Sequence, residues 1–212
     1  MRTAWSTVGS IWKARNMAIR IILYIDYKSP YAYLAKEPAY QLVDGFDVEL
    51  TWRHYTLDIP AYLDAVDQRT ERNWHKVRYA YMDARRFANK RGLIVRGPKK
   101  IFDSSIAAIG MLFAQAKGTF RPYNDLVFER FWKRELDIEN QDAITAVLAE
   151  AGADVAEFAT FLAGPGRAAH DRMMQEAEAL GVFGVPTFVL DGELFWGCDR
   201  IDLLKERLRQ VG

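Results

Sequence analysis

The chain has 212 residues, half of them hydrophobic and 27% charged, which is long enough to bury one substantial core and one inserted lobe. Its 29 Lys and Arg residues nearly balance its 28 Asp and Glu residues, so no single-sign field attracts nucleic acid or an anionic membrane. The single cysteine, Cys198, excludes an internal disulfide, a dithiol redox couple and a zinc site built mainly from thiolates. Composition therefore predicts a compact protein of a reducing compartment without a nucleic-acid partner.

Residues 1–17 carry Arg2, Lys13 and Arg15 and no acidic residue, a composition shared by transit peptides and amphipathic anchors. They lack the continuous apolar segment and the small-residue cleavage site of a secretory signal. We predict a flexible extension, most of which would be absent if translation begins at Met17. No apolar run approaches the roughly 20 residues that a membrane span needs, so we expect a cytoplasmic protein without membrane contact.

The first predicted elements form a β-α-β unit. Residues 19–27 are a nearly continuous apolar and aromatic run, which is typical of a central strand covered on both faces. Ser29 and Pro30 suit the N-cap and the first position of a helix that ends near residue 45. Residues 46–55 then alternate between apolar and polar side chains, which predicts a second strand with one buried face.

A long helical region follows. From about Pro60 to Leu180 helix formers dominate, strand-like runs are scarce and breakers are confined to short loops. The predicted helices span residues 69–91, 104–117, 122–135, 141–151, 154–162 and 166–180.

The pattern returns to strands near the end of the sequence. Two short apolar runs flank Asp191-Gly192, a pair that favours the type I′ turn of a β-hairpin. Asp199 is expected to cap a final amphipathic helix over residues 200–211. The order β-α-β, helices, β-β-α is the thioredoxin topology with a large all-helical insertion, an α/β fold.

This order predicts two domains that face one cleft. Residues 18–60 and 181–212 would form the thioredoxin-like domain, and residues 61–180 the inserted helical domain.

Three segments carry a resemblance to a known group of proteins, namely YIDYKSPYAYLA, GVFGVPTFVLDGELFWG and CDRIDLL. Together they resemble the 2-hydroxychromene-2-carboxylate isomerases and the kappa-class glutathione transferases, a branch of the DsbA-like thioredoxin-fold superfamily. Where a DsbA-like oxidoreductase has Cys-x-x-Cys, this sequence reads Ser29-Pro30-Tyr31-Ala32, which excludes a disulfide cycle. The resemblance implies glutathione as cofactor, a small-molecule substrate and a homodimeric assembly.

Ser29 is the candidate catalytic residue. The N-terminus of a helix stabilises an anion through its backbone N–H groups and its dipole. The resemblance implies that Ser29 and Pro30 contact glutathione and that the Ser29 hydroxyl donates a hydrogen bond to its sulfur. Such a bond would lower the thiol pKa from about 8.5 toward neutrality without making Ser29 a nucleophile. The simpler alternative is an N-cap worth about 1 kcal/mol.

Two further pairs complete the implied glutathione site. The resemblance implies a cis Pro186 that exposes the backbone of Val185 to the cysteinyl part of glutathione. It also aligns Cys198 and Asp199 with a Ser-Asp or similar pair that holds the γ-glutamyl end, where Asp199 would meet the ammonium. The alternatives are an ordinary strand-edge proline and an Asp that only caps a helix.

Candidate substrate residues lie at the predicted strand ends and in a basic loop. Tyr31, Arg53 and His54 occupy the edge where ligands bind in open α/β sheets, and Arg53 or His54 could meet a substrate carboxylate. Lys99 lies in the segment RGPKK, which is a candidate for anion recognition or simply a solvated loop. The three histidines show no spacing with acids that resembles a metal site, so no metal is predicted.

Three functions from different classes stay open. The leading hypothesis is a glutathione-dependent isomerase or transferase acting on an unsaturated aromatic carboxylate. The second is a redox-inactive binding module that holds a peptide or a glutathione conjugate beside Pro186. The third is an oxidoreductase that uses Cys198 alone, which lacks a resolving partner.

Overall fold

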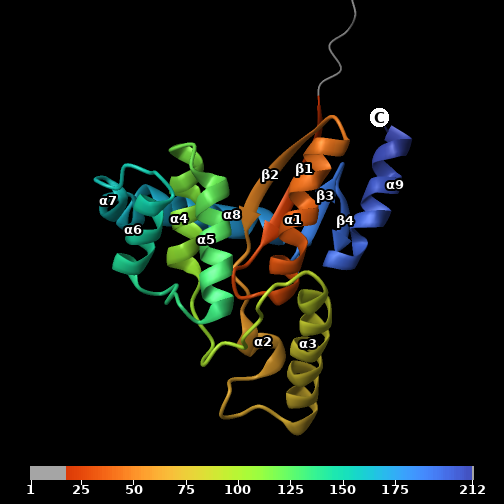
Figure 1. Ribbon diagram of the computed structural model, residues 1–212, viewed down its shortest axis with the longest axis horizontal. Coiled ribbons are helices and arrows are strands. Elements are labelled where there is room, and N and C mark those ends of the chain that lie inside the picture. Colours follow the sequence, from red (N-terminus) through yellow and green to blue (C-terminus); the bar gives the residue numbers. More distant parts are fainter. Residues whose placement is uncertain (1–17, 212) are drawn as a thin grey trace, which may run out of the picture.

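The computed structural model describes residues 18–211, so the predicted extension and the proposed start at Met17 lie outside the described residues. A four-stranded sheet in the order β2-β1-β3-β4 forms its centre (Figure 1). The strands are β1 (Ile19–Ile25), β2 (Val48–His54), β3 (Thr187–Leu190) and β4 (Glu193–Trp196). β1 and β2 are parallel, and the other neighbours are antiparallel. The central position predicted for the first strand is confirmed.

Helices cover the sheet and continue beyond its β2 edge (Figure 1). They are α1 (Pro30–Gly45), α2 (Ile59–Leu63), α3 (Glu71–Lys90), α4 (Ser105–Ala116), α5 (Phe120–Lys133), α6 (Gln141–Glu150), α7 (Phe158–Ala163), α8 (Pro165–Ala179) and α9 (Ile201–Val211). A 3₁₀ turn, η1 (Cys198–Arg200), precedes α9. α1 and α8 contact β2, and α9 contacts β4. No helix within residues 18–211 is both long and apolar enough to cross a bilayer.

Both faces of β1 are buried over its last three residues, whereas Arg20 near its start is exposed. Ile21, Leu23 and Ile25 belong to the main core, which α1 and the inserted helices complete. Tyr24 points to the opposite face and packs in a smaller cluster that includes Val185. Because successive side chains of a strand alternate between faces, one strand serves both clusters.

α1 contains a proline that is compensated from another helix. Pro38 lies inside α1 and has no N–H, so it cannot donate to the carbonyl of Leu34 four residues earlier. The Nη1 atom of Arg91, the residue that follows α3, donates to that carbonyl at 2.6 Å. This contact satisfies the carbonyl and ties the end of α3 to the middle of α1.

The Asp191-Gly192 hairpin is confirmed, with φ angles of 51° and 82° that suit a type I′ turn. One helix was not predicted, and one expectation is wrong. α2 does not appear among the predicted helices. Asp199 does not cap α9, because it lies inside η1, whose N-cap position belongs to Gly197 at a φ of 116°. The Gly197 N–H donates to Pro186 O at 2.8 Å, so a long-range contact sets where the helical turn begins.

Candidate functional site

Ser29 lies between β1 and α1 and is 5% exposed. Its Oγ accepts a hydrogen bond from Ala32 N–H at 3.2 Å and donates one to Val185 O at 3.2 Å. The predicted N-cap is therefore confirmed, and the same hydroxyl joins two segments that are 156 residues apart in sequence.

The loop opposite Ser29 contains the predicted cis peptide bond between Val185 and Pro186. Val185 is 7% exposed, and its N–H has no hydrogen-bond partner among residues 18–211. The cis proline expected from the resemblance is confirmed, and it lies beside the N-terminus of α1.

The first turn of α1 has one uncommitted donor. Pro30 has no N–H, Ala32 N–H is taken by Ser29 Oγ and Tyr33 N–H is taken by Ser29 O. The N–H of Tyr31 makes no hydrogen bond to another described residue. Together with the dipole of a 16-residue helix, it makes this turn suitable for an anion.

A buried ion pair lies just before Ser29. Asp26 is fully buried and accepts hydrogen bonds from Lys28 N–H at 3.0 Å and from Leu57 N–H at 2.8 Å. Lys28 Nζ lies 3.5 Å from Asp26 Oδ2 and donates to Leu57 O at 2.9 Å. These contacts join the turn after β1 to the segment that follows β2.

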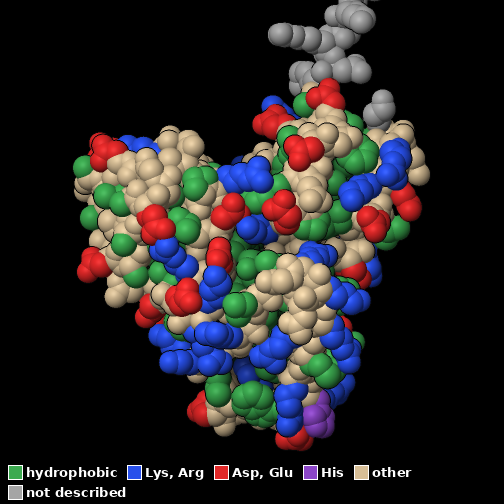
Figure 2. Space-filling model, in the orientation of Figure 1, with side chains coloured by type: hydrophobic (Ala, Val, Ile, Leu, Met, Phe, Trp, Pro, Cys, Tyr) green, Lys and Arg blue, Asp and Glu red, His purple; other side chains and the backbone are tan. Residues whose placement is uncertain are grey.

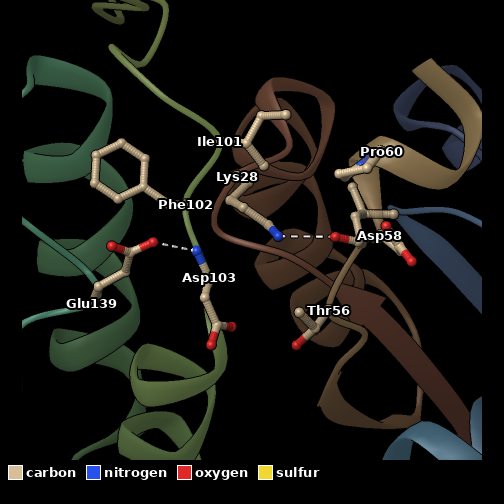
Figure 3. Close-up of a pocket in the computed structure, with 9 residues that line it drawn as sticks. Lys28, Thr56, Asp58, Pro60, Ile101, Phe102, Asp103 and Glu139 are labelled. Atoms are coloured by element: carbon tan, nitrogen blue, oxygen red, sulfur yellow. Dashed lines mark hydrogen bonds between the residues drawn. The ribbon is translucent and has the colours of Figure 1, made fainter. Parts of the chain in front are cut away.

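Lys28 forms part of the wall of a cleft of about 420 Å³ (Figure 3). The segment after β2 lines one side and the segment before α4 lines the other. The lining residues are Lys28, Thr56, Leu57, Asp58, Pro60, Ile101, Phe102, Asp103 and Glu139. Among these described residues Lys28 is the single cation.

His54 does not reach this cleft, contrary to its expected contact with a substrate. It is fully buried, and its Nδ1 lies 3.3 Å from Thr56 Oγ1, which in turn lies 2.9 Å from His170 Nε2. Burial lowers the pKa of His54 to about 4, although Asp26, 3.6 Å from Nε2, opposes this effect. A neutral, enclosed imidazole is suited to holding β2 in place and not to binding a carboxylate.

The other predicted substrate residues are dispersed. Arg53 Nη1 lies 3.5 Å from Glu176 of α8. The Tyr31 hydroxyl donates to Asp83 at 3.2 Å, and burial, aided by Asp83, raises its pKa. Lys99 lines a separate cavity of about 450 Å³ that shares only Phe102 with the cleft. Figure 2 shows Lys and Arg side chains gathered over the lower half of this face, consistent with a solvated basic surface.

Cys198 and Asp199 lie in η1, which contacts α1. The Cys198 side chain packs against the main core, and burial, with Asp199 beside it, raises the pKa of the thiol to about 11. The side chain of Asp199 is 67% exposed and pairs with Arg200 at 2.6 Å. A thiol protonated at neutral pH argues against an oxidoreductase that depends on Cys198.

Lys28 lines the cleft but was not among the site residues predicted from the sequence. One signal was present, because Asp26 and Lys28 carry opposite charges two residues apart at the end of a predicted strand. The contact that holds the ammonium comes from Leu57, 29 residues away, which no local pattern reveals.

Known proteins resemble this chain over most of its length. A model of the DSBA-like thioredoxin domain matches residues 20–209. A Pseudomonas putida protein named 2-hydroxychromene-2-carboxylate isomerase is 29% identical over 196 residues, covering 89% of this chain and 93% of its own. A Sphingobium xenophagum protein of the same name is 26% identical over 196 residues, covering 91% and 99%.

Two solved structures resemble this chain over most of its length. A structure titled 2-hydroxychromene-2-carboxylate isomerase has a TM-score of 0.73 and 26% identity, covering 91% of this chain and 96% of that chain. A probable DsbA oxidoreductase from Streptomyces coelicolor has a TM-score of 0.74 at 20% identity, covering 91% and 89%, which shows likeness of fold alone.

Proposed function

The chain belongs to the DSBA-like thioredoxin domain family, and from that premise we propose a glutathione-dependent isomerase or transferase that acts on an unsaturated aromatic carboxylate. The fold is thioredoxin-like with a helical insertion, and its relatives named as isomerases support an enzyme. The observation that carries the proposal is the Ser29 hydroxyl at the N-terminus of α1, directed at the cis Val185-Pro186 loop.

The residues present fit glutathione at three points. The partnerless N–H of Val185 suits pairing with an extended peptide backbone, as in an added strand. The uncommitted Tyr31 N–H and the Ser29 hydroxyl suit an anionic sulfur. The exposed carboxylate of Asp199 suits the ammonium of glutathione, which would take the place of Arg200 as its partner. Bound glutathione would supply a thiol whose ionised form is a strong nucleophile.

Ser29 has to change partners for this role. A hydroxyl has one proton, and here that proton is donated to Val185 O. Donation to a ligand sulfur therefore requires rotation of the hydroxyl away from Val185 O, while Oγ can still accept from Ala32 N–H. The chain thus holds the donor in place before the ligand arrives and restrains its rotation with one weak bond.

The test is calorimetric titration with glutathione, combined with ultraviolet absorbance of the thiolate across pH. The wild type is expected to bind glutathione and to lower the pKa of its thiol. Ser29→Ala removes one hydrogen bond to a charged group, so the pKa of the bound thiol should rise by about 1 to 2.

A matched control separates the site from simple helix capping. Thr70 caps α3 by accepting from Asn73 N–H at 3.3 Å, so Thr70→Ala loses a cap of the same type far from Ser29 in the sequence. Thr70→Ala should leave the pKa of the bound thiol unchanged. A wild type that does not bind glutathione would refute the proposal. Binding with an unshifted thiol pKa and no turnover would instead favour the binding module.

A further inference from the structure

The ammonium of Lys28 has hydrogen-bonding capacity that the protein does not use. Its side chain is 6% exposed and lines the cleft. Of its three N–H groups one is donated to Leu57 O at 2.9 Å, whereas Asp26 Oδ2 at 3.5 Å lies beyond the usual hydrogen-bond distance. Donors therefore remain for a molecule in the cleft, and Asp26 offsets the cost of burying the charge.

The carboxylates around the cleft are already engaged. Both oxygens of Asp103 accept from Ser105, one from its N–H and one from its hydroxyl, each at 2.9 Å. Glu139 accepts from Asp103 N–H and from the Lys100 ammonium, and Asp58 caps α2 through one oxygen. Among the lining residues, Lys28 is the cation with N–H donors left for an anion, and it must attract that anion against the negative charges of Asp58, Asp103 and Glu139.

Apart from Thr56, the remaining lining side chains are apolar. Pro60 lies on one side of the cleft, and Ile101 and Phe102 lie on the other (Figure 3). The volume of about 420 Å³ falls within the range of small-molecule sites, and flat apolar walls suit a planar ring. Lys28 directly precedes Ser29 in the chain, although Ser29 itself does not line the cleft.

We propose that Lys28 recognises a negatively charged oxygen, of the phenolate or enolate type, on a planar aromatic ligand held in this cleft. A lysine ammonium is a point donor suited to a single oxygen, whereas bidentate carboxylates are matched by arginine. This assignment is separate from Arg53, His54 and Lys99, which the sequence suggested for a substrate carboxylate or another anion. It rests on the proposed function in one respect, that the cleft receives the second substrate.

The experiment is a titration with 4-nitrophenolate in the absence of glutathione, followed by the visible absorbance of the phenolate. Lys28→Gln is the first variant, because its amide N–H can still donate to Leu57 O while the charge is lost. A charged hydrogen bond is worth about 1.5–3 kcal/mol, so affinity should fall about tenfold or more. Nitrobenzene, a neutral ring of similar size, should bind both proteins within about twofold of each other.

Two further variants test whether the effect belongs to the charge of Lys28. Lys99→Gln removes a charge from the neighbouring cavity and should leave 4-nitrophenolate affinity unchanged. Lys28→Met, checked by thermal unfolding, provides a second uncharged variant if Lys28→Gln is poorly folded. Equal weakening of both probes, a change below about twofold, or no binding of 4-nitrophenolate to the wild type would overturn the proposal. Because glutathione is omitted, failure of glutathione binding leaves this result unaffected.

Discussion

The surroundings of Cys198 keep its thiol protonated at neutral pH. Packing against the core, with Asp199 next in the chain, raises the pKa of the thiol from 9.0 to about 11. The thiolate is the reactive form, so its population at neutral pH should be about a hundredfold lower than for an unperturbed thiol. Alkylation of the wild type by iodoacetamide should therefore be slow at pH 7 and should accelerate up to about pH 11. A rate equal to that of a small free thiol at pH 7 would contradict this prediction.

His54 makes folding stability depend on pH. The pKa of His54 is about 4 in the folded protein, against 6.5 for the unperturbed group, because burial disfavours the imidazolium. The unfolded chain binds the extra proton between these values, so the free energy of unfolding should rise from pH 4 to pH 6.5. The full effect is roughly 3 kcal/mol. Urea unfolding at pH 5 and pH 7 should show about 2 kcal/mol of this effect, because those two pH values span only part of the range.

Two variants test whether His54 causes the pH dependence of the free energy of unfolding. His54→Gln should flatten the rise between pH 5 and pH 7, since the titrating imidazole is gone. His75→Gln is the control, because His75 is 70% exposed and its loss should leave the slope unchanged. A slope that persists in His54→Gln would assign the effect to other groups.

Among the elements, α1 and α3 are coupled through the carbonyl of Leu34. Arg91→Met removes its donor and should cost about 1–2 kcal/mol, because the carbonyl of a residue that is 1% exposed is left without a partner. Pro38→Ala supplies a backbone N–H to the same carbonyl, so Arg91→Met should cost less in that background. Urea unfolding of the wild type, both single variants and the double variant measures this coupling. Additive effects would show that the two donors do not substitute for each other.

The elements that sequence predicted well are those with strong local signals. The apolar run of β1, the Ser29-Pro30 start of α1 and the Asp191-Gly192 turn each encode their conformation within a few residues. α2 has five residues and no buried side chain, which is too short for a periodic pattern.

The site was less predictable because its geometry depends on distant contacts. The start of the η1 turn depends on the bond from Gly197 to Pro186 O. His54 is enclosed because α8 packs over it, with Met173 Sδ accepting from His54 N–H at 3.3 Å. The sequence around a histidine at a strand end does not show whether a distant helix will cover it, so the burial of His54 could not be predicted.

At the scale of the whole molecule, a polar contact joins α1 to the inserted helices. The Tyr40 hydroxyl accepts from Asn124 Nδ2 at 2.8 Å, and Asn124 is fully buried in α5. Tyr40→Phe should cost about 1–3 kcal/mol, because it leaves a buried amide donor unpaired. Because α5 and the sheet share one core, the loss should shift a single cooperative unfolding transition.

A second substitution tests this reasoning. Tyr40→Phe combined with Asn124→Leu removes both polar partners, and it should destabilise the protein by less than the sum of the two single variants. Separate transitions followed by near- and far-ultraviolet circular dichroism would instead show that the sheet and the inserted helices unfold independently.

The bond between Ser29 and Val185 has a consequence for biosynthesis. Ser29 and α1 leave the ribosome before the carbonyl that orients the hydroxyl, which follows 156 residues later together with β3, the partner of β1. Until residues 181–211 emerge, β1 has an open edge that is prone to pairing with other chains. The Ser29 hydroxyl therefore lacks its Val185 acceptor until the β3-β4 hairpin closes against β1.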